Sequence, residues 1–213
     1  MNPRDLIIQH LGPAQWKEVL RGWGEQGAIR LLDEKLQLKT HKIYIVQGAH
    51  GQFDFTALPF GSYGYYAANG REALRLTRTN KEIEQVLAAN WEHLSTVPPV
   101  LLAGLILPFY DGGIKATHLP LANEAALRAL CSSPQRTMNE SAFADAQSKM
   151  RDSSVTVRDQ NVILRAITLM GWMHDKQNLG IERVTIQKSG RVELAAREVL
   201  AKRIFDTTPS IDY

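Results

Sequence analysis

The spacing of hydrophobic residues changes near residue 41, and this change limits the fold class more than any other feature of the sequence. Before it, apolar residues such as Leu6, Ile7 and Leu11 recur at the spacing typical of helices. After it, "HKIYIVQG" is rich in β-branched residues and "QFDFTAL" alternates apolar with polar residues, as strands do. The pair Asn69-Gly70 then predicts a tight hairpin turn. Helices followed by hairpin-forming strands indicate an α+β protein.

The N-terminal half is therefore expected to combine helices with a β-rich block. Three segments with helical spacing are predicted as helices, and these are residues 3–11, 13–23 and 28–36. The β-rich block is predicted over residues 41–78. Thr79 and Glu82 form a capping box, so a helix is expected to begin there, with Trp91 on its apolar face. Val97-Pro98-Pro99 is expected to end it.

A wholly apolar run follows, with one glycine in it. "LAGLI" at residues 102–106, followed by Asp111-Gly112, partly resembles the LAGLIDADG motif of homing endonucleases. In that family the acidic residue lies just past the apolar run, whereas residues 107–110 intervene here and no second copy exists. Pro108 is also expected to break a helix. We therefore predict a buried strand over residues 100–107 that enters a glycine-rich turn, with a second strand over residues 114–119.

The C-terminal half is predicted to be rich in helices. Helices are predicted over residues 123–130, 139–150 and 157–175, with Asn123 as the cap of the first. "IERVTIQ", the turn "KSG" and "RVEL" predict a β-hairpin, and residues 196–204 predict a last helix. The fold class is thus α+β: an antiparallel sheet with a helical N-terminus and a helix-rich C-terminal part ending in a β-hairpin plus helix. A single compact domain is expected over residues 1–213, with a subdomain boundary near 131–138 as the alternative.

Composition excludes several classes of protein. Cys131 is the single cysteine of 213 residues, which rules out an internal disulfide framework and a cysteine-based zinc site. No uninterrupted apolar segment approaches the roughly 20 residues that span a bilayer, and the first residues do not read as a signal peptide. A cytoplasmic location without a membrane partner is therefore expected. The net charge of +3 permits a nucleic-acid partner without demanding one.

Catalytic and cofactor motifs are missing from the sequence. It contains no phosphate-binding P-loop, no dinucleotide-binding glycine motif and no nucleophile elbow. Its histidines are scattered, and none has a partner at zinc-binding spacing. We therefore predict no metal and no cofactor, and whether the protein is an enzyme is left open.

The stretch "FGSYGYYAANGREALRLTRT" at residues 60–79 carries the strongest indication of a binding surface. Tyrosine rings stack on bases and arginines neutralise phosphates, so a hairpin that presents both can hold single-stranded nucleic acid. The candidate residues are Tyr63, Tyr65, Tyr66, Arg71, Arg75 and Arg78. Half-buried tyrosines and solvated arginines of an ordinary sheet are the alternative interpretation.

The C-terminal strand–turn–strand–helix pattern resembles the wing and last helix of a winged-helix domain. The resemblance covers "GIERVTIQKSGRVELAAREVLAKRI" and places Lys188 and Arg191 at the tip of the wing. In that family the wing contacts DNA phosphates, so these two residues are added to the candidate nucleic-acid site. The sequence departs from the winged-helix pattern in one respect, because only one long helix, 157–175, is predicted before the hairpin.

These features together predict a non-enzymatic, cytoplasmic, nucleic-acid-binding protein. Membership of a larger assembly, protein partners, self-association and the choice between DNA and RNA are left open. One alternative is a hydrolase or nuclease with a dispersed metal or acid–base site, for which the candidates are Asp54, Asp111, His118 and His174. The other alternative is a structural or interaction module.

Overall fold

The first sheet of the structure lies where the hydrophobic spacing of the sequence changes. In the computed structural model of the chain, helix α1 (Pro3–Ala28) leads into four strands, β1 (Ile29–Leu31), β2 (Lys42–Val46), β3 (Gly64–Ala68) and β4 (Ala73–Leu76). The strands form an antiparallel sheet in the order β1-β2-β3-β4. The structure describes residues 1–32, 35–36, 38–46, 64–76, 81–110, 117–132, 136–171 and 177–207.

Local sequence explains how α1 begins and where it bends. The side chain of Asn2 accepts a hydrogen bond from the Arg4 amide at 3.0 Å, which caps the first turn, and Pro3 suits that turn because it needs no amide donor there. Gly12 has a φ of +76°, a conformation that glycine adopts without steric cost, and Pro13 starts the next helical segment. The predicted break between the first two helices is therefore confirmed as a kink at Gly12. The two helical segments follow each other directly, so both belong to α1.

The hairpin predicted at Asn69-Gly70 is also confirmed. β3 and β4 pair antiparallel, with Tyr65 opposite Leu76 and Tyr66 opposite Arg75. The side-chain oxygen of Asn69 accepts hydrogen bonds from the amides of residues 71 and 72 at 2.8 and 3.0 Å, so this asparagine holds the turn.

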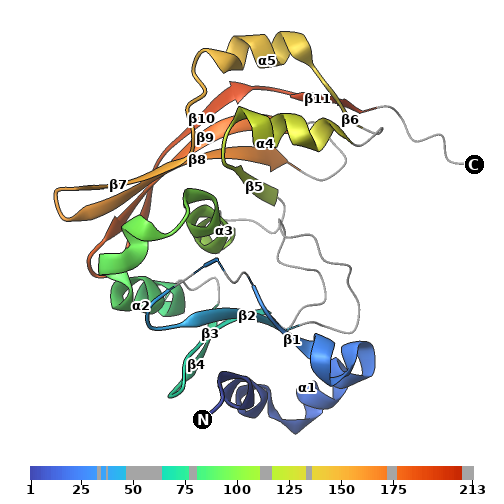
Figure 1. Cartoon of the computed structure of the whole chain (residues 1–213), viewed down its shortest axis with the longest axis vertical. Coiled ribbons are helices and arrows are strands. Elements are labelled where there is room, and N and C mark those ends of the chain that lie inside the picture. Colours follow the sequence, from blue (N-terminus) through green and yellow to red (C-terminus); the bar gives the residue numbers. More distant parts are fainter. Residues whose placement is uncertain are drawn as a thin grey trace, which may run out of the picture. The chain divides into compact units, whose positions relative to one another are not determined.

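Helices cover both faces of this sheet. α1 packs on the face that carries Val46 and Tyr66, and its contributions to the shared core include Ile7 and Val19. Helix α2 (Lys81–Ala89) contacts β4, and the 3-10 helix η1 (Trp91–Thr96) follows it (Figure 1). The residues of β2 and β3 on the face away from α1, such as Ile43 and Tyr65, are buried as well, so neither face of the sheet is open to solvent along its middle.

The chain divides into two compact units. The first comprises residues 1–97 together with the turn 187–191, and the second comprises residues 98–186 and 192–213. The expectation of one compact body, and of a subdomain boundary near 131–138, stays a prediction.

The second unit is built around a five-stranded sheet with helices on both faces. Its helical elements are α3 (Pro99–Tyr110), α4 (Glu124–Ala129), η2 (Leu130–Ser132) and α5 (Glu140–Gln147). Its strands are β5 (Thr117–Leu121), β6 (Arg136–Met138), β7 (Ser154–Arg158), β8 (Asn161–Gly171), β9 (Asn178–Gln187), β10 (Val192–Ala201) and β11 (Phe205–Thr207). The large sheet has the order β10-β9-β8-β5 with β7 also on β8, and β11 pairs with β6.

The core of this unit follows from the alternation of side chains along β8. Ile167 and Leu169 pack with Leu127 of α4 and Phe143 of α5, which lie on one side of the sheet (Figure 1). α3 contacts β5 and β8. Asn123 caps α4 as predicted, because its side chain accepts from the amide of residue 126 at 3.0 Å. Asn139 caps α5 in the same way, accepting from the amide of residue 142 at 3.1 Å.

The strand predicted over residues 100–107 is wrong, because this segment is the helix α3. Its apolar residues are buried around most of the helix, so the sequence shows no polar face from which a helical period can be read. Pro99 occupies the first turn, where proline is favoured, and the helix continues past Pro108 only to Tyr110. Pro108 lacks the amide that would bond to the carbonyl of residue 104, and the helix ends two residues after it rather than before it.

The helix predicted over residues 157–175 is also wrong. β7 and β8 form an antiparallel hairpin there, and Asp159 and Gln160 at its tip have φ values of +49° and +60°. Most of β8 is buried, so its apolar residues run on without the polar alternation of a half-exposed strand. Such a run resembles a buried helix in sequence.

Two shorter predicted helices are strands as well. The segment 28–36 contains β1 near its beginning, and most of the segment 196–204 lies in β10. β10 is rich in alanine, leucine, arginine and glutamate, which favour helices, but pairing with β9 outweighs this local preference. The α+β class predicted from the sequence is confirmed, while the balance of helix and strand in its C-terminal part shifts toward strand.

Candidate functional site

The tyrosines of the predicted binding hairpin face the interior. Tyr66 is 1% exposed and Tyr65 is 8% exposed, so the expectation that their rings meet solvent is wrong. Consecutive residues of a strand point to opposite faces, and here both faces are covered. Burial raises the pKa of Tyr65 to about 12 and also raises that of Tyr66, on which the charge of Arg75 acts in the opposite direction.

The charged candidates of the hairpin are exposed. Arg71 lies in the turn after β3, and Arg75 lies on β4 opposite Tyr66. Lys188 and Arg191 are exposed in the turn between β9 and β10. Tyr63 and Arg78 lie outside the described residues. The described positive charges of the predicted site therefore lie at the surface. Tyr65 and Tyr66 are buried, so they are not available to stack on a base.

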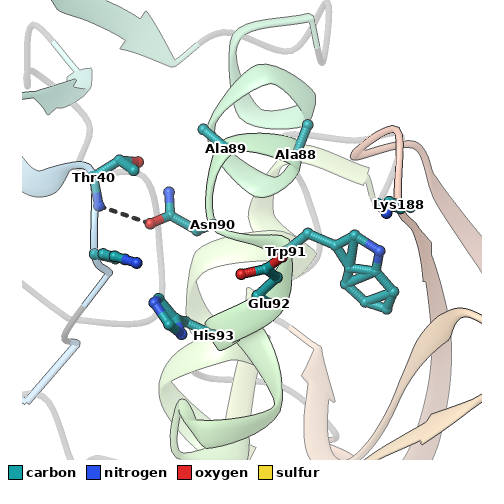
Figure 2. A pocket seen from close by; sticks show the side chains of 9 residues that line it. Thr40, Ala88, Ala89, Asn90, Trp91, Glu92, His93 and Lys188 are labelled. Carbon is teal, nitrogen blue, oxygen red and sulfur yellow. Dashed lines mark hydrogen bonds between the residues drawn. The ribbon is translucent and has the colours of Figure 1, made fainter.

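A pocket of about 350 Å³ brings Lys188 together with residues that the sequence did not single out. We call it the Trp91 pocket, and it is lined by Lys39, Thr40, residues 88–93 and Lys188 (Figure 2). The indole of Trp91 extends toward the turn that carries Lys188, whereas His93 lies on the side of Thr40 (Figure 2). Three segments that are far apart in sequence therefore form one site inside the first unit.

Asn90 holds the wall of the Trp91 pocket in place. Its side chain is 1% exposed, and its amide donates a hydrogen bond to the Val86 carbonyl at 2.7 Å. Its side-chain oxygen accepts a hydrogen bond from the Thr40 amide at 2.9 Å. Because both polar ends of this buried amide are paired, the segment with Lys39 and Thr40 is fixed to the end of α2.

Gly190 brings the turn with Lys188 close to α2. Gly190 has a φ of +85°, and a Cβ at this position would overlap the backbone of Glu84 and Ala88. The turn is closed by a hydrogen bond from the Gly190 amide to the Gln187 carbonyl at 2.8 Å. The absence of a side chain at residue 190 is therefore what allows Lys188 to line the pocket.

A second pocket of about 430 Å³ adjoins the first, and both are lined by Lys39 and Thr40. We call it the Tyr44 pocket, and its other lining residues are Asn2, Pro3, Leu38, His41, Lys42, Tyr44, Ala68, Asn69 and Gly70. Tyr44 is partly exposed on β2. Burial raises its pKa, and the charge of Arg4 acts in the opposite direction.

A hydroxyl, an imidazole and a carboxylate lie in sequence beside these pockets. The Thr40 hydroxyl lies 2.8 Å from His41 Nδ1, and His41 Nε2 lies 3.5 Å from a carboxylate oxygen of Glu72. His41 is 4% exposed, whereas the side chain of Glu72 is 44% exposed. If the hydroxyl donates to Nδ1, the ring proton lies on Nε2, which is near the carboxylate but forms no hydrogen bond with it.

The lysines around the two pockets keep their charges available to a ligand. Lys39, Lys42 and Lys188 are exposed, and none of them forms an ion pair within the described part of the chain. Glu92 is the carboxylate that lines the Trp91 pocket. Positive charge thus exceeds negative charge among the lining residues of both pockets, which favours an anionic ligand.

The side chains proposed for a dispersed hydrolase site lie outside the described structure. Asp54, Asp111 and His174 are not among the described residues, and of His118 the structure describes only the backbone, on β5. Within the described ranges, no group of three or more histidine, cysteine, aspartate or glutamate side chains is arranged to hold a metal ion. That alternative assignment stays a prediction.

Trp91 illustrates why the sequence missed the pocket. With regular helical spacing, Trp91 falls on the same apolar face as Leu87 and Leu94. In the structure α2 ends at Ala89, and η1 turns each residue by about 120° rather than 100°, so that Trp91 leaves the core face and is partly exposed. Lys39 and Tyr44 carry no sequence signal, because only the tertiary fold brings the segments that line the two pockets together.

Comparison with known proteins gave no match to this chain among family models, curated proteins or solved structures. Among the described helices, none combines the length and the apolar character that crossing a membrane requires. The fold and the site define the class only as an α+β protein with two adjoining pockets that carry lysines and aromatic rings.

Proposed function

We propose that this chain is a nucleic-acid-binding protein whose ligand lies in the Trp91 pocket. The observation that carries the proposal is the convergence of Lys39, Lys188 and a partly exposed indole in one pocket. Lysines neutralise phosphates, and aromatic rings stack on bases, so these groups match the two parts of a nucleotide. Lys188 belongs to the site that the sequence predicts, whereas Trp91 replaces the buried tyrosines.

The exposed arginines extend the same proposal. Arg71, Arg75 and Arg191 are exposed in the first unit, where they can contact the phosphates of a longer ligand. They position the ligand without reading its sequence, since phosphate contacts carry no base identity. Membership of a larger assembly is a separate proposal that these residues neither require nor oppose.

Charge removal in the pocket tests the proposal. Binding of a fluorescent oligonucleotide at low salt is measured for wild type and for the double variant Lys39→Gln/Lys188→Gln. We expect its affinity to fall by about tenfold, because two phosphate contacts are lost. The matched control is Lys149→Gln/Lys202→Gln, which removes two exposed lysines of the second unit that do not line either pocket.

The control decides whether the pocket or the overall charge attracts the ligand. The same loss in both double variants would place binding outside the pocket, and no binding by wild type at low salt would end the proposal. A third variant, Arg71→Ala/Arg75→Ala, measures what the exposed hairpin arginines add.

A second candidate function, hydrolysis, is favoured by the arrangement of Thr40, His41 and Glu72. A carboxylate that orients an imidazole allows the imidazole to take a proton from a hydroxyl nucleophile. In this candidate the Thr40 oxygen attacks the carbonyl carbon of an ester while its proton moves to His41 Nδ1, and that proton passes to the alcohol that leaves as the ester C–O bond breaks. Water then hydrolyses the acyl-threonine, with His41 again taking and returning the proton.

Turnover of a chromogenic ester separates this candidate from the first. Thr40→Val is expected to lower kcat/KM by about 100-fold or more, and Thr40→Ser is expected to retain activity. Thr96→Val is the control, because the Thr96 hydroxyl donates to the His93 carbonyl and has no imidazole partner. Absence of turnover in wild type, or equal rates in the Thr40 and Thr96 valine variants, would dismiss hydrolysis at this site.

A further inference from the structure

The two pockets adjoin through one short segment of chain. Lys39 and Thr40 line both the Trp91 pocket and the Tyr44 pocket. The amide of Thr40 is held by Asn90, so the segment between the pockets is anchored to the end of α2. A ligand that fills one pocket therefore passes the shared residues to reach the other.

Each pocket contains one aromatic ring and one lysine of its own. Trp91 and Lys188 line only the first pocket, and Tyr44 and Lys42 line only the second, while Lys39 lines both. Cation and ring therefore occur in each pocket, with a shared cation between them. A nucleic-acid strand has the same composition, because bases alternate with phosphates along it.

Both rings are supported by the fold and reach solvent. Tyr44 lies on β2 opposite Tyr66 of β3, and one side of it packs against the core beneath α1. Trp91 is the first residue of η1 and follows the buried Asn90. A ring that is held on one side and open on the other can stack on a base with little loss of conformational entropy.

We infer that the Trp91 and Tyr44 pockets are two neighbouring base-stacking subsites for one single strand of nucleic acid. The inference rests on the proposed function and adds the form of the ligand. In a duplex the faces of the bases are stacked on each other, so they are closed to protein rings, whereas a single strand offers them. The lysines then contact the phosphates between and beside the stacked bases.

The test compares a single strand with a duplex of the same sequence. The probe is a fluorescent thymidine oligonucleotide of about 12 nucleotides, alone or paired with its complement. Trp91→Leu and Tyr44→Leu are each expected to weaken binding of the single strand by about fivefold or more. Duplex binding is expected to be weaker in wild type and unchanged by either substitution.

Conservative variants guard against a loss of folding. Trp91→Phe and Tyr44→Phe keep a ring that can stack, so they are expected to bind the single strand more tightly than the leucine variants. Unfolding midpoints in urea are measured for all four variants alongside binding. Equal binding by the phenylalanine and leucine variants of the same residue would overturn a stacking role for that residue and with it the pair of subsites.

The outcomes separate this inference from the proposal on which it rests. If the lysine double variant weakens binding but the ring variants do not, the two-subsite inference is wrong and nucleic-acid binding stands. An effect of only one ring, or equal affinity for strand and duplex, also overturns it. If neither lysines nor rings matter, both the inference and the proposed function fail.

Discussion

Tyr65 is a buried phenol on β3, and its burial links stability to alkaline pH. Its pKa is raised from 10.0 to about 12. Below pH 10 both folded and unfolded chains hold the proton, but between pH 10 and 12 mainly the unfolded chain releases it. The free energy of unfolding should then fall by about 1.4 kcal/mol per pH unit from this residue.

Urea unfolding at pH 9, 10 and 11 measures this contribution, because the pKa of about 12 for buried Tyr65 sets the upper limit of the pH window. Tyr65→Phe has no proton to release, so its stability should fall less steeply with pH than that of wild type. Lysines also lose their charge in this range, but they do so in both proteins. Equal slopes would contradict the enclosed position of the phenol.

Glu182 and Arg197 form an ion pair inside the second unit. Glu182 is 0% exposed, and two nitrogens of Arg197 lie 2.6 and 2.8 Å from the same carboxylate oxygen. Arg197→Ala leaves a buried carboxylate without this cation and should lower the free energy of unfolding by about 3 kcal/mol. In urea unfolding, the double variant Glu182→Leu/Arg197→Met should lose less than Arg197→Ala alone. A larger loss in the double variant would show that the pair stabilises the sheet by more than its burial costs.

At the scale of elements, the position of the turn 187–191 depends on a single glycine. Gly190→Ala puts a Cβ into the backbone of Glu84 and requires a positive φ of alanine, so it should displace the turn and Lys188 with it. We expect a loss of about 1–3 kcal/mol in urea unfolding and weaker oligonucleotide binding. A variant with wild-type binding would show that Lys188 does not contribute through its position in the pocket.

Gly104→Ala is the matched control for that substitution. A Cβ at Gly104, in α3, meets nothing within 4 Å, and the residue is exposed. Alanine favours a helix more than glycine does, so this variant should gain about 0.5–1 kcal/mol in stability. Oligonucleotide binding should be unchanged, because α3 does not line either pocket.

Sequence patterns located the elements with local signals and missed those that tertiary packing decides. The hairpin at Asn69 and the helix α4 were predicted from the asparagine that holds the turn or the cap, whereas α5 was predicted without its cap, Asn139. α3 and β8 were exchanged between helix and strand, since a segment buried on nearly all sides loses the polar period that distinguishes the two. A helix was predicted where the second half of β10 lies, because its residues favour helices and only the pairing with β9 makes them a strand.

The candidate site was predicted only in part for a related reason. Lys188 was identified from its place in a short turn, which is a local feature. Lys39, Tyr44 and Trp91 come from segments that only the fold brings together, and no spacing rule connects them. The buried tyrosines show the reverse error, because aromatic residues in a strand read the same whether one face or both faces are covered.

At the scale of the whole molecule, the net charge is only +3. The salt dependence of oligonucleotide affinity should therefore distinguish contacts of single lysines with phosphates from attraction by the total charge. Binding to a single strand weakens with salt, and each neutralised phosphate contributes about −0.7 to the slope of log affinity against log salt. If Lys42 contacts one phosphate, Lys42→Gln should reduce the steepness by about 0.7 over roughly 50–200 mM salt. Lys149→Gln changes the net charge equally but lies in the second unit, so its slope should match wild type. Equal slopes in all three proteins would contradict a phosphate contact at Lys42, whereas a reduction in both variants would assign the salt dependence to total charge.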